Sequence, residues 1–151
     1  MPKTLLQTSP TDVLALAADL CYALGESQVI DTASTDPQTG VTYGEVVVAD
    51  RTANAVSITT AIDELRLVFP VAASGHVRDF ELCVDIAASV TAAPALAIIP
   101  PSGENIVTEN ADGALPQLVA AGGIVLLCFS EKPPAGHFFV KGEELKEVSN
   151  V

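Results

Sequence analysis

Three acidic side chains, Asp79, Glu81 and Asp85, recur at odd-numbered positions within residues 78–86. In a β-strand such positions point to one side, with alternate residues roughly 7 Å apart at ~3.3 Å per residue. Carboxylates arranged in this way could bind calcium, or act as general acid and base, if another segment brought a partner group to them. Without that group they form a solvated outer face, which is the interpretation we favour. Whether they bind an ion stays open at this point.

Histidine is the second residue type that could do chemistry here, and the chain has two, His76 and His137. Neither has a companion at the spacing of metal ligands. A metal site built from both histidines and Asp79 is therefore a minor alternative to two surface histidines.

An acidic pair, Asp63 and Glu64, stands beside Arg66 and could also supply functional carboxylates. We interpret these charges as a cluster at a strand edge, where they discourage pairing with other strands. The chain has no Gly-x-Ser-x-Gly nucleophile elbow, and Gly122–Gly123 is not followed by the Lys-Ser/Thr of a phosphate-binding loop. We therefore predict that the protein is not an enzyme, with no catalytic, cofactor-binding or metal-binding residue.

The three cysteines, Cys21, Cys83 and Cys128, are odd in number and far apart. Neither a metal site nor a disulfide scaffold is favoured by that spacing. Because each cysteine has apolar neighbours in sequence, we expect all three to act as small hydrophobic residues.

Alternating hydrophobicity predicts the strands that would position these residues. Within residues 78–86 the apolar side chains alternate with the polar ones, as in an antiparallel strand that is buried on one face. Further strands are predicted at 41–49, 55–62, 65–69, 95–99, 105–108, 124–129 and 137–141. Residues 50–54 are expected to join the first two of these as a β-hairpin, and residues 26–40 to form a loop. Since no helices suited to parallel crossovers are predicted between the strands, the fold class is mainly β, an antiparallel β-sandwich.

One helix is predicted before the strands, at residues 10–24, with Ser9 as its cap and Gly25 at its end. One side of it carries an apolar set at helical spacing: Val13, Leu16, Ala17, Leu20 and Leu24. A second apolar side carries Leu14, Ala18 and Cys21. Because such a helix must be covered on both sides, we expect the first set to form an interface with other copies or other proteins. Residues 1–62 would then be an anchor and assembly region, and residues 63–151 a β-sandwich domain.

Charge excludes several classes of partner. The 151 residues include 19 acidic and 7 basic side chains, a net charge of −12. Nucleic acids and anionic membranes are poor partners, because both bind clustered Lys and Arg. Only 17% of residues are charged, against about 25% in an ordinary domain. We infer that other subunits cover part of the surface, in a homo-oligomer for which a trimer is one option.

The order of short apolar segments and turns in the second half of the chain resembles that of a known kind of module. It runs from LRLVFP at 65–70 through RDFEL at 78–82 and AIIP at 97–100, then LPQL at 115–118 and GHFFV at 136–140. Residues 65–148 resemble a small β-sandwich module of bacteriophage virion proteins, such as tail-fibre, head-fibre and decoration proteins. The chain departs from many such modules in having no tryptophan.

The resemblance implies a non-enzymatic structural subunit of a virion. Such a subunit is made in the host cytoplasm, assembles as a multimer, and contributes to particle stabilisation or attachment. Its partners would be other copies, other virion proteins and, for attachment, the host cell surface. The alternative is a ligand-binding β-sandwich module for glycans or calcium.

Overall fold

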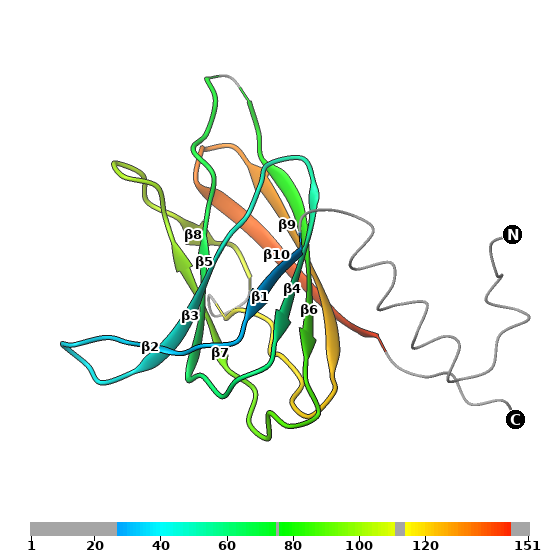
Figure 1. Ribbon diagram of the computed structural model, residues 1–151. Coiled ribbons are helices and arrows are strands. Elements are labelled where there is room, and N and C mark those ends of the chain that lie inside the picture. The colour runs from blue at the N-terminus through cyan, green and yellow to red at the C-terminus, as the bar shows by residue number, and fades with distance from the viewer. Residues whose placement is uncertain (1–26, 75, 111–113, 146–151) are drawn as a thin grey trace, which may run out of the picture.

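The computed structural model describes residues 27–74, 76–110 and 114–145, and in them the chain forms ten β-strands (Figure 1). The first five strands are β1 (Ser27–Ile30), β2 (Ser34–Thr35), β3 (Thr42–Val47), β4 (Ala53–Ile58) and β5 (Glu64–Val68). The last five are β6 (Asp79–Ile86), β7 (Ala95–Ile99), β8 (Val107–Thr108), β9 (Ile124–Lys132) and β10 (His137–Leu145). The fold is mainly β, and β3 to β10 lie where strands were predicted. β1 and β2 lie in the segment that was predicted to be a loop.

The strands form two facing sheets. Sheet A has the order β1-β4-β6-β9-β10-β8, and sheet B the order β2-β3-β5-β7. From β3 to β7 the chain alternates between the two layers (Figure 1), whereas β2 and β3 both lie in sheet B. β1, β4 and β6 are neighbours in sheet A, and β3, β5 and β7 are neighbours in sheet B. All of these neighbours are parallel. The result is a β-solenoid-like arrangement of about four turns.

The prediction of an antiparallel β-sandwich is therefore wrong. Among the described residues, five of the eight strand pairings are parallel, and antiparallel pairing is limited to β2–β3, β6–β9 and β9–β10. The prediction assumed that parallel neighbours need a helix between them. Here the crossovers within β1–β4–β6 and β3–β5–β7 are made by strands of the opposite sheet, and β9 lies between β8 and β10, so parallel pairing arises without a helix in the described residues.

The predicted β-hairpin is wrong for the same reason. β3 belongs to sheet B and β4 to sheet A, so residues 48–52 connect two layers instead of two paired strands. Arg51 takes a left-handed conformation with φ 56° in this connection. The Thr52 hydroxyl donates to the Ala49 carbonyl at 3.1 Å. Turn chemistry in the sequence located the connection correctly but could not say which sheet the next strand joins.

A core of apolar side chains fills the space between the sheets. On β5 the side chains of Leu65 and Leu67 are fully buried. Four phenylalanines gather at one end of this core: Phe69, Phe80, Phe129 and Phe138. The rings of Phe80 and Phe129 stack with centroids 4.7 Å apart. These ring contacts pack β6 against β9 and β10.

The helix predicted at residues 10–24 lies outside the described residues. The boundary predicted after residue 62 runs between strands that pair, because β3 pairs with β5 and β4 with β6. A separate anchor role for residues 1–62 stays a prediction. In the described part of the chain there is no helix long and apolar enough to cross a membrane.

Candidate functional site

The three acidic residues of β6 lie on the outer face of sheet A. Asp79 and Glu81 are exposed, and Asp85 is half-buried. The register places a hydroxyl, a thiol and an aliphatic side chain opposite them on β9: Ser130, Cys128 and Ile124 respectively. The described residues contain no group of three His, Cys, Asp or Glu side chains placed to hold a metal ion. Sheet pairing therefore does not bring these carboxylates the partner group that an ion site or an acid–base pair needs.

A hollow of about 720 Å³ lies over the upper part of this face. Its polar lining mixes one basic side chain with two acids, two hydroxyls and a thiol: Arg51, Thr52, Asp79, Glu81, Cys128 and Ser130. Cys128 is a free thiol. Burial, followed by the negative charge of Glu81, raises the pKa of Cys128, so the thiol stays protonated at neutral pH and is a weak nucleophile.

Beside this hollow, the outer face of sheet A carries an apolar patch that we call the outer cluster. It consists of Ala55, Cys83 and Ile124, with Leu126 and Leu145 packed against them. Ala55, Cys83 and Ile124 are only 1%, 2% and 4% exposed, although they point away from the main core. Cys83 is disulfide-bonded, so the prediction that all cysteines act only as small hydrophobic residues is wrong for this one.

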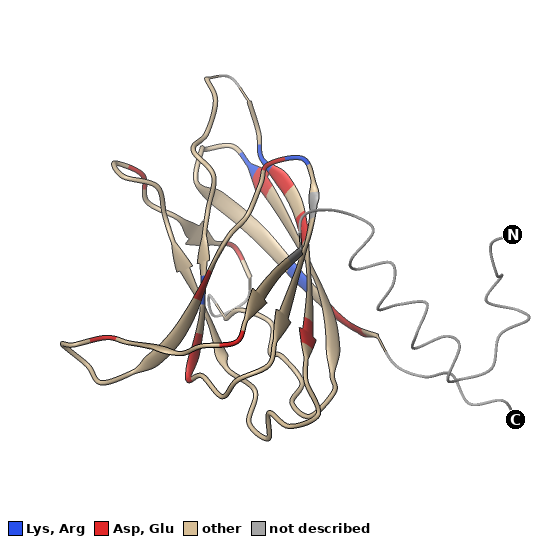
Figure 2. Cartoon of the chain, viewed as in Figure 1, with Lys and Arg blue, Asp and Glu red and all other residues tan. Residues whose placement is uncertain are grey.

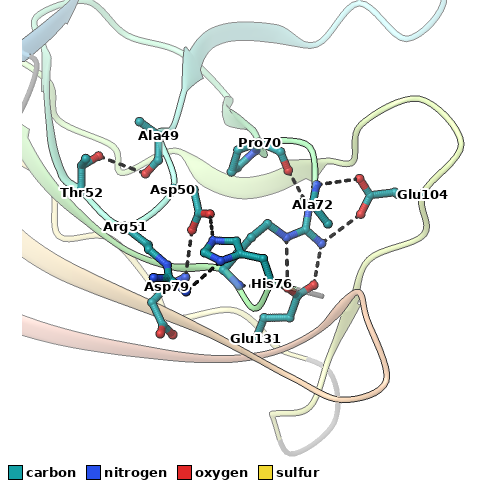
Figure 3. Close-up of polar contacts among 11 residues, drawn as sticks. Ala49, Asp50, Arg51, Thr52, Pro70, Ala72, His76, Asp79, Glu104 and Glu131 are labelled. Carbon is teal, nitrogen blue, oxygen red and sulfur yellow. Dashed lines mark hydrogen bonds and ion pairs between the residues drawn. The ribbon is translucent and has the colours of Figure 1, made fainter. Parts of the chain in front are cut away.

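Charged residues gather at one end of the sheets (Figure 2), around the connections that precede β4 and β6 and the β9–β10 turn. His76 lies here between two charged partners (Figure 3). Its Nε2 contacts Asp50, and its Nδ1 lies 2.7 Å from an Arg51 nitrogen. Because both ring nitrogens are occupied, His76 has none left for a metal ion or for proton abstraction from a substrate. Asp50 also accepts a hydrogen bond from the Asp79 backbone N–H at 3.1 Å, which ties this connection to β6.

Arg78 forms a second, buried network at the same end. Its side chain is 0% exposed and pairs with Glu131 at 2.6 Å and with Glu104 at 3.0 Å. A further guanidinium N–H donates to the Pro70 carbonyl at 2.5 Å. Glu104 in turn accepts from the Ala72 backbone N–H at 3.3 Å (Figure 3). One buried arginine therefore ties the β5–β6 connection, in which it lies, to the β7–β8 connection and to strand β9.

Burial is the largest single influence on the pKa of Arg78 and of Glu131, but their hydrogen bonds and charge pairing together outweigh it. Burial lowers the pKa of Arg78, but its contacts with Glu131 and Glu104 outweigh that effect and raise the pKa above its ordinary value. Burial likewise raises the pKa of Glu131, yet hydrogen bonds from Arg78 and the Gly136 backbone N–H bring the net pKa below its usual range. Both groups stay charged at neutral pH, and their role is structural.

The interpretation of Asp63, Glu64 and Arg66 as a strand-edge cluster is wrong, because β5 is central in sheet B between β3 and β7. Arg66 pairs with Glu64 at 2.6 Å and with Asp36 at 3.1 Å. Its guanidinium carbon lies 3.8 Å from the centre of the Tyr43 ring. These contacts form a partly solvated network on the outer face of sheet B.

Asp63 caps the start of β3 instead. Its carboxylate accepts hydrogen bonds from the backbone N–H and the hydroxyl of Thr42. Those bonds, the backbone one first, lower the pKa of Asp63.

His137 pairs with Glu109, and the described residues hold no group of three side chains placed to bind a metal ion, so the site with His76 and Asp79 is not assembled. The predicted interface residues lie outside the described residues: Val13, Leu16, Ala17, Leu20 and Leu24.

Sequence reasoning missed Arg78, Glu131 and Glu104, whose ion pairs hold the charged end of the sheets together. Charged residues next to turns are ordinarily solvated, so composition carried no signal that Arg78 is buried. The outer cluster was missed because alternation reports which side chains leave the main core, not whether something covers them.

Comparison with known proteins adds no relative: no family model, curated protein or solved structure matches the chain.

Proposed function

We propose that the protein is a non-enzymatic structural subunit of a virion, which assembles as a homo-oligomer and contributes to particle stabilisation or attachment. The resemblance of residues 65–148 to phage virion modules supports the location. The low proportion of charge, 17%, supports burial of surface between copies.

The observation that carries assembly is the open edge of sheet A at β1, beside exposed valines on β1 and β3. β1 is the terminal strand of sheet A, so one side of its backbone has no neighbour among the strands of the described residues. Val29 on β1 and Val47 on β3 are 59% and 60% exposed. The Gln28 side chain donates to the Val47 carbonyl at 2.8 Å and accepts from its N–H at 3.2 Å, which joins the two strands at this end.

An open strand edge with exposed valines is a template for pairing with another chain. In a coil built of stacked parallel strands, a second copy can continue the stack with little change in geometry. The same edge suits contact with another virion protein. At the charged end of the sheets, the contacts of buried Arg78 tie together the β5–β6 connection, the β7–β8 connection and β9.

Analytical ultracentrifugation over a concentration series tests assembly. The wild type is expected to sediment as a multimer, and the double variant Val29→Lys/Val47→Lys as a smaller species, since lysine on a strand edge opposes pairing. Val71→Lys is the matched control, because Val71 is 74% exposed but lies in the connection before β6. A wild type that stays monomeric at all concentrations would contradict the proposal.

Peptide mass spectrometry of purified particles tests the virion location.

A further inference from the structure

We propose that β7, the terminal strand of sheet B, pairs antiparallel with β7 of a second copy of this chain, around a two-fold axis at Ala97. The contact joins the sheets B of the two copies into one continuous sheet. This inference rests on the proposed assembly of copies and adds to it an interface that does not involve the β1 edge.

One side of the β7 backbone has no neighbouring strand in the described residues, because β7 ends the order β2-β3-β5-β7. The Ala95 N–H donates to the Asp63 carbonyl at 3.0 Å, and the Ile99 carbonyl accepts a hydrogen bond at 3.0 Å from the connection that follows β5. Backbone groups of successive residues point to opposite sides of a strand. The N–H and C=O groups of Leu96 and Ile98 therefore point away from β5, toward the open edge.

Two other places where a neighbouring strand is missing are closed by side-chain amides. On β3, the Gln28 amide donates to the Val47 carbonyl at 2.8 Å and accepts from the Val47 N–H at 3.2 Å. On β10, beyond its short pairing with β8, the Asn110 amide donates to the Val140 carbonyl at 2.6 Å and accepts from the Val140 N–H at 2.9 Å. Each amide supplies the donor and acceptor of an absent strand. In the described residues β7 has no such cap, so its edge is the one left able to pair.

The side chains of β7 do nothing to prevent pairing. Edge strands are ordinarily protected by charges, prolines or bulges within the strand. β7 has the sequence ALAII, without a charged residue or a proline. Leu96 and Ile98 pack against the main core, so a second β7 beside them would extend that core. Because the strand carries no charge, two copies of it meet without local repulsion.

Prolines on both sides of β7 define the register. Pro94 and Pro100 flank the strand and have no N–H to donate, so pairing is confined to residues 95–99. The antiparallel register that uses this whole segment places Ala95 opposite Ile99 of the second copy. The same register places Ala97 on the two-fold axis, opposite itself.

This register also matches the backbone groups at the open edge. Leu96 of each copy lies opposite Ile98 of the other, and the two residues exchange both N–H···O=C bonds. Ala97 then forms a pair without hydrogen bonds, in which the Cα atoms approach to about 4.5 Å. A small side chain is required at such a self-pair, and alanine provides it.

The charges of sheet B do not oppose the contact. Arg66 lies beside Ala97 in register, and it is already paired with Glu64 and Asp36. In the joined sheet the two Arg66 residues are three strand spacings apart, roughly 14 Å at about 4.8 Å per strand. Repulsion over that distance is largely screened at physiological salt.

Disulfide trapping tests the register. Ala97→Cys places two thiols on the axis, where a Cα separation of about 4.5 Å lies within the range that a disulfide spans. Ala95→Cys is the matched control on the same strand, because its two copies would lie roughly 13 Å apart at ~3.3 Å per residue. Both variants are incubated with oxidised glutathione and run on a non-reducing denaturing gel. The wild type, run beside them, reports any dimer formed through the native cysteines.

Ala97→Cys is expected to form a covalent dimer roughly tenfold faster than Ala95→Cys, since only the first pair meets disulfide geometry. Equal rates for the two variants, or no covalent dimer from Ala97→Cys, would overturn the proposal.

Sedimentation velocity separates this interface from the β1 edge. In the Val29→Lys/Val47→Lys background the β7 contact should leave a dimer, and adding Ala97→Lys should convert it to a monomer, because two lysines would meet on the axis. Ala93→Lys, at an exposed alanine before the strand, is the matched control and should leave the dimer intact.

The outcomes distinguish the two interfaces. A dimer that survives Ala97→Lys, or a Val29→Lys/Val47→Lys variant that is already monomeric, would overturn the β7 contact and leave assembly at the β1 edge standing. A wild type whose size responds to Ala97→Lys but not to Val29→Lys/Val47→Lys would support the β7 contact and contradict assembly at the β1 edge.

Amide hydrogen exchange gives a readout at single residues. The N–H groups of Leu96 and Ile98 should exchange roughly tenfold more slowly at high than at low protein concentration, because only a second copy accepts their hydrogen bonds. The Ala95 N–H donates to Asp63 within the chain and should exchange at the same rate at both concentrations. Exchange of Leu96 and Ile98 that does not depend on concentration would contradict the pairing.

Discussion

The outer faces of the two sheets follow the same alternation and end in different environments. On sheet B, Arg66 pairs with Glu64 and Asp36 and stacks on Tyr43, in a network that is about one-fifth to one-quarter exposed. On sheet A, the outer cluster around Cys83 is almost completely buried. The comparison teaches that period-two alternation defines two sides of a strand, and that only the partners of each side decide which one meets solvent.

The largest expected effect comes from replacing an arginine of the buried network and comparing it with an arginine of the solvated network. Arg78→Met should lower the free energy of unfolding by about 3–5 kcal/mol, because it leaves Glu131 buried without its partner. Arg66→Met, on the outer face of sheet B, should cost less than about 1 kcal/mol, since its pairs are partly solvated. Urea denaturation of both variants measures the difference. Similar losses for the two would remove the distinction between a buried and a solvated network.

A matched pair of alanines tests the faces themselves. Ala55→Asp places a carboxylate in the outer cluster and should cost roughly 2–3 kcal/mol. Ala97→Asp places the same group beside Arg66 on the outer face of sheet B and should be close to neutral. Chemical unfolding at pH 7 checks both. If Ala55→Asp is as stable as the wild type, the outer cluster is solvated.

The pH dependence of stability tests the contribution of buried Glu131. The pKa of Glu131 is below its ordinary value in the folded protein, so its stabilising contribution is complete above that ordinary value. The contribution is lost as pH falls through the lowered folded pKa. Glu131→Gln should therefore be less stable at neutral pH and should lose less stability than the wild type on acidification. Thermal melts from pH 7 to pH 3 measure this, and parallel acid profiles for both proteins would refute it.

Calcium should have the smallest effect. Asp79, Glu81 and Asp85 face Ser130, Cys128 and Ile124 in the register of sheet A, which does not build a calcium site. Isothermal titration with calcium chloride is expected to show no binding heat. A saturable signal that Glu81→Gln abolishes would favour the ligand-binding alternative.

Much of the secondary structure followed from the sequence. β5, β6 and β9 were predicted from alternation and from apolar runs, and their inward side chains form the core. The pairing of those strands did not follow. The connection at residues 48–52 has the turn chemistry of a hairpin, and nothing local specifies that β4 joins the opposite sheet.

The candidate site was only partly predictable. The outward direction of Asp79 and Glu81 followed from alternation along β6. Burial of Arg78 did not, because it depends on Glu131 and Glu104, which lie 53 and 26 positions away in the sequence. Such non-local partners are set by the fold and leave no periodic signal.

Hydroxyl-radical footprinting of the native protein tests the contrast between the faces most directly. Leu126, Ile124 and Leu145 on the outer face of sheet A are expected to be oxidised much more slowly than Tyr43 and Val47 on the outer face of sheet B. Equal oxidation of the two faces, after correction for the intrinsic reactivity of each residue type, would contradict the account.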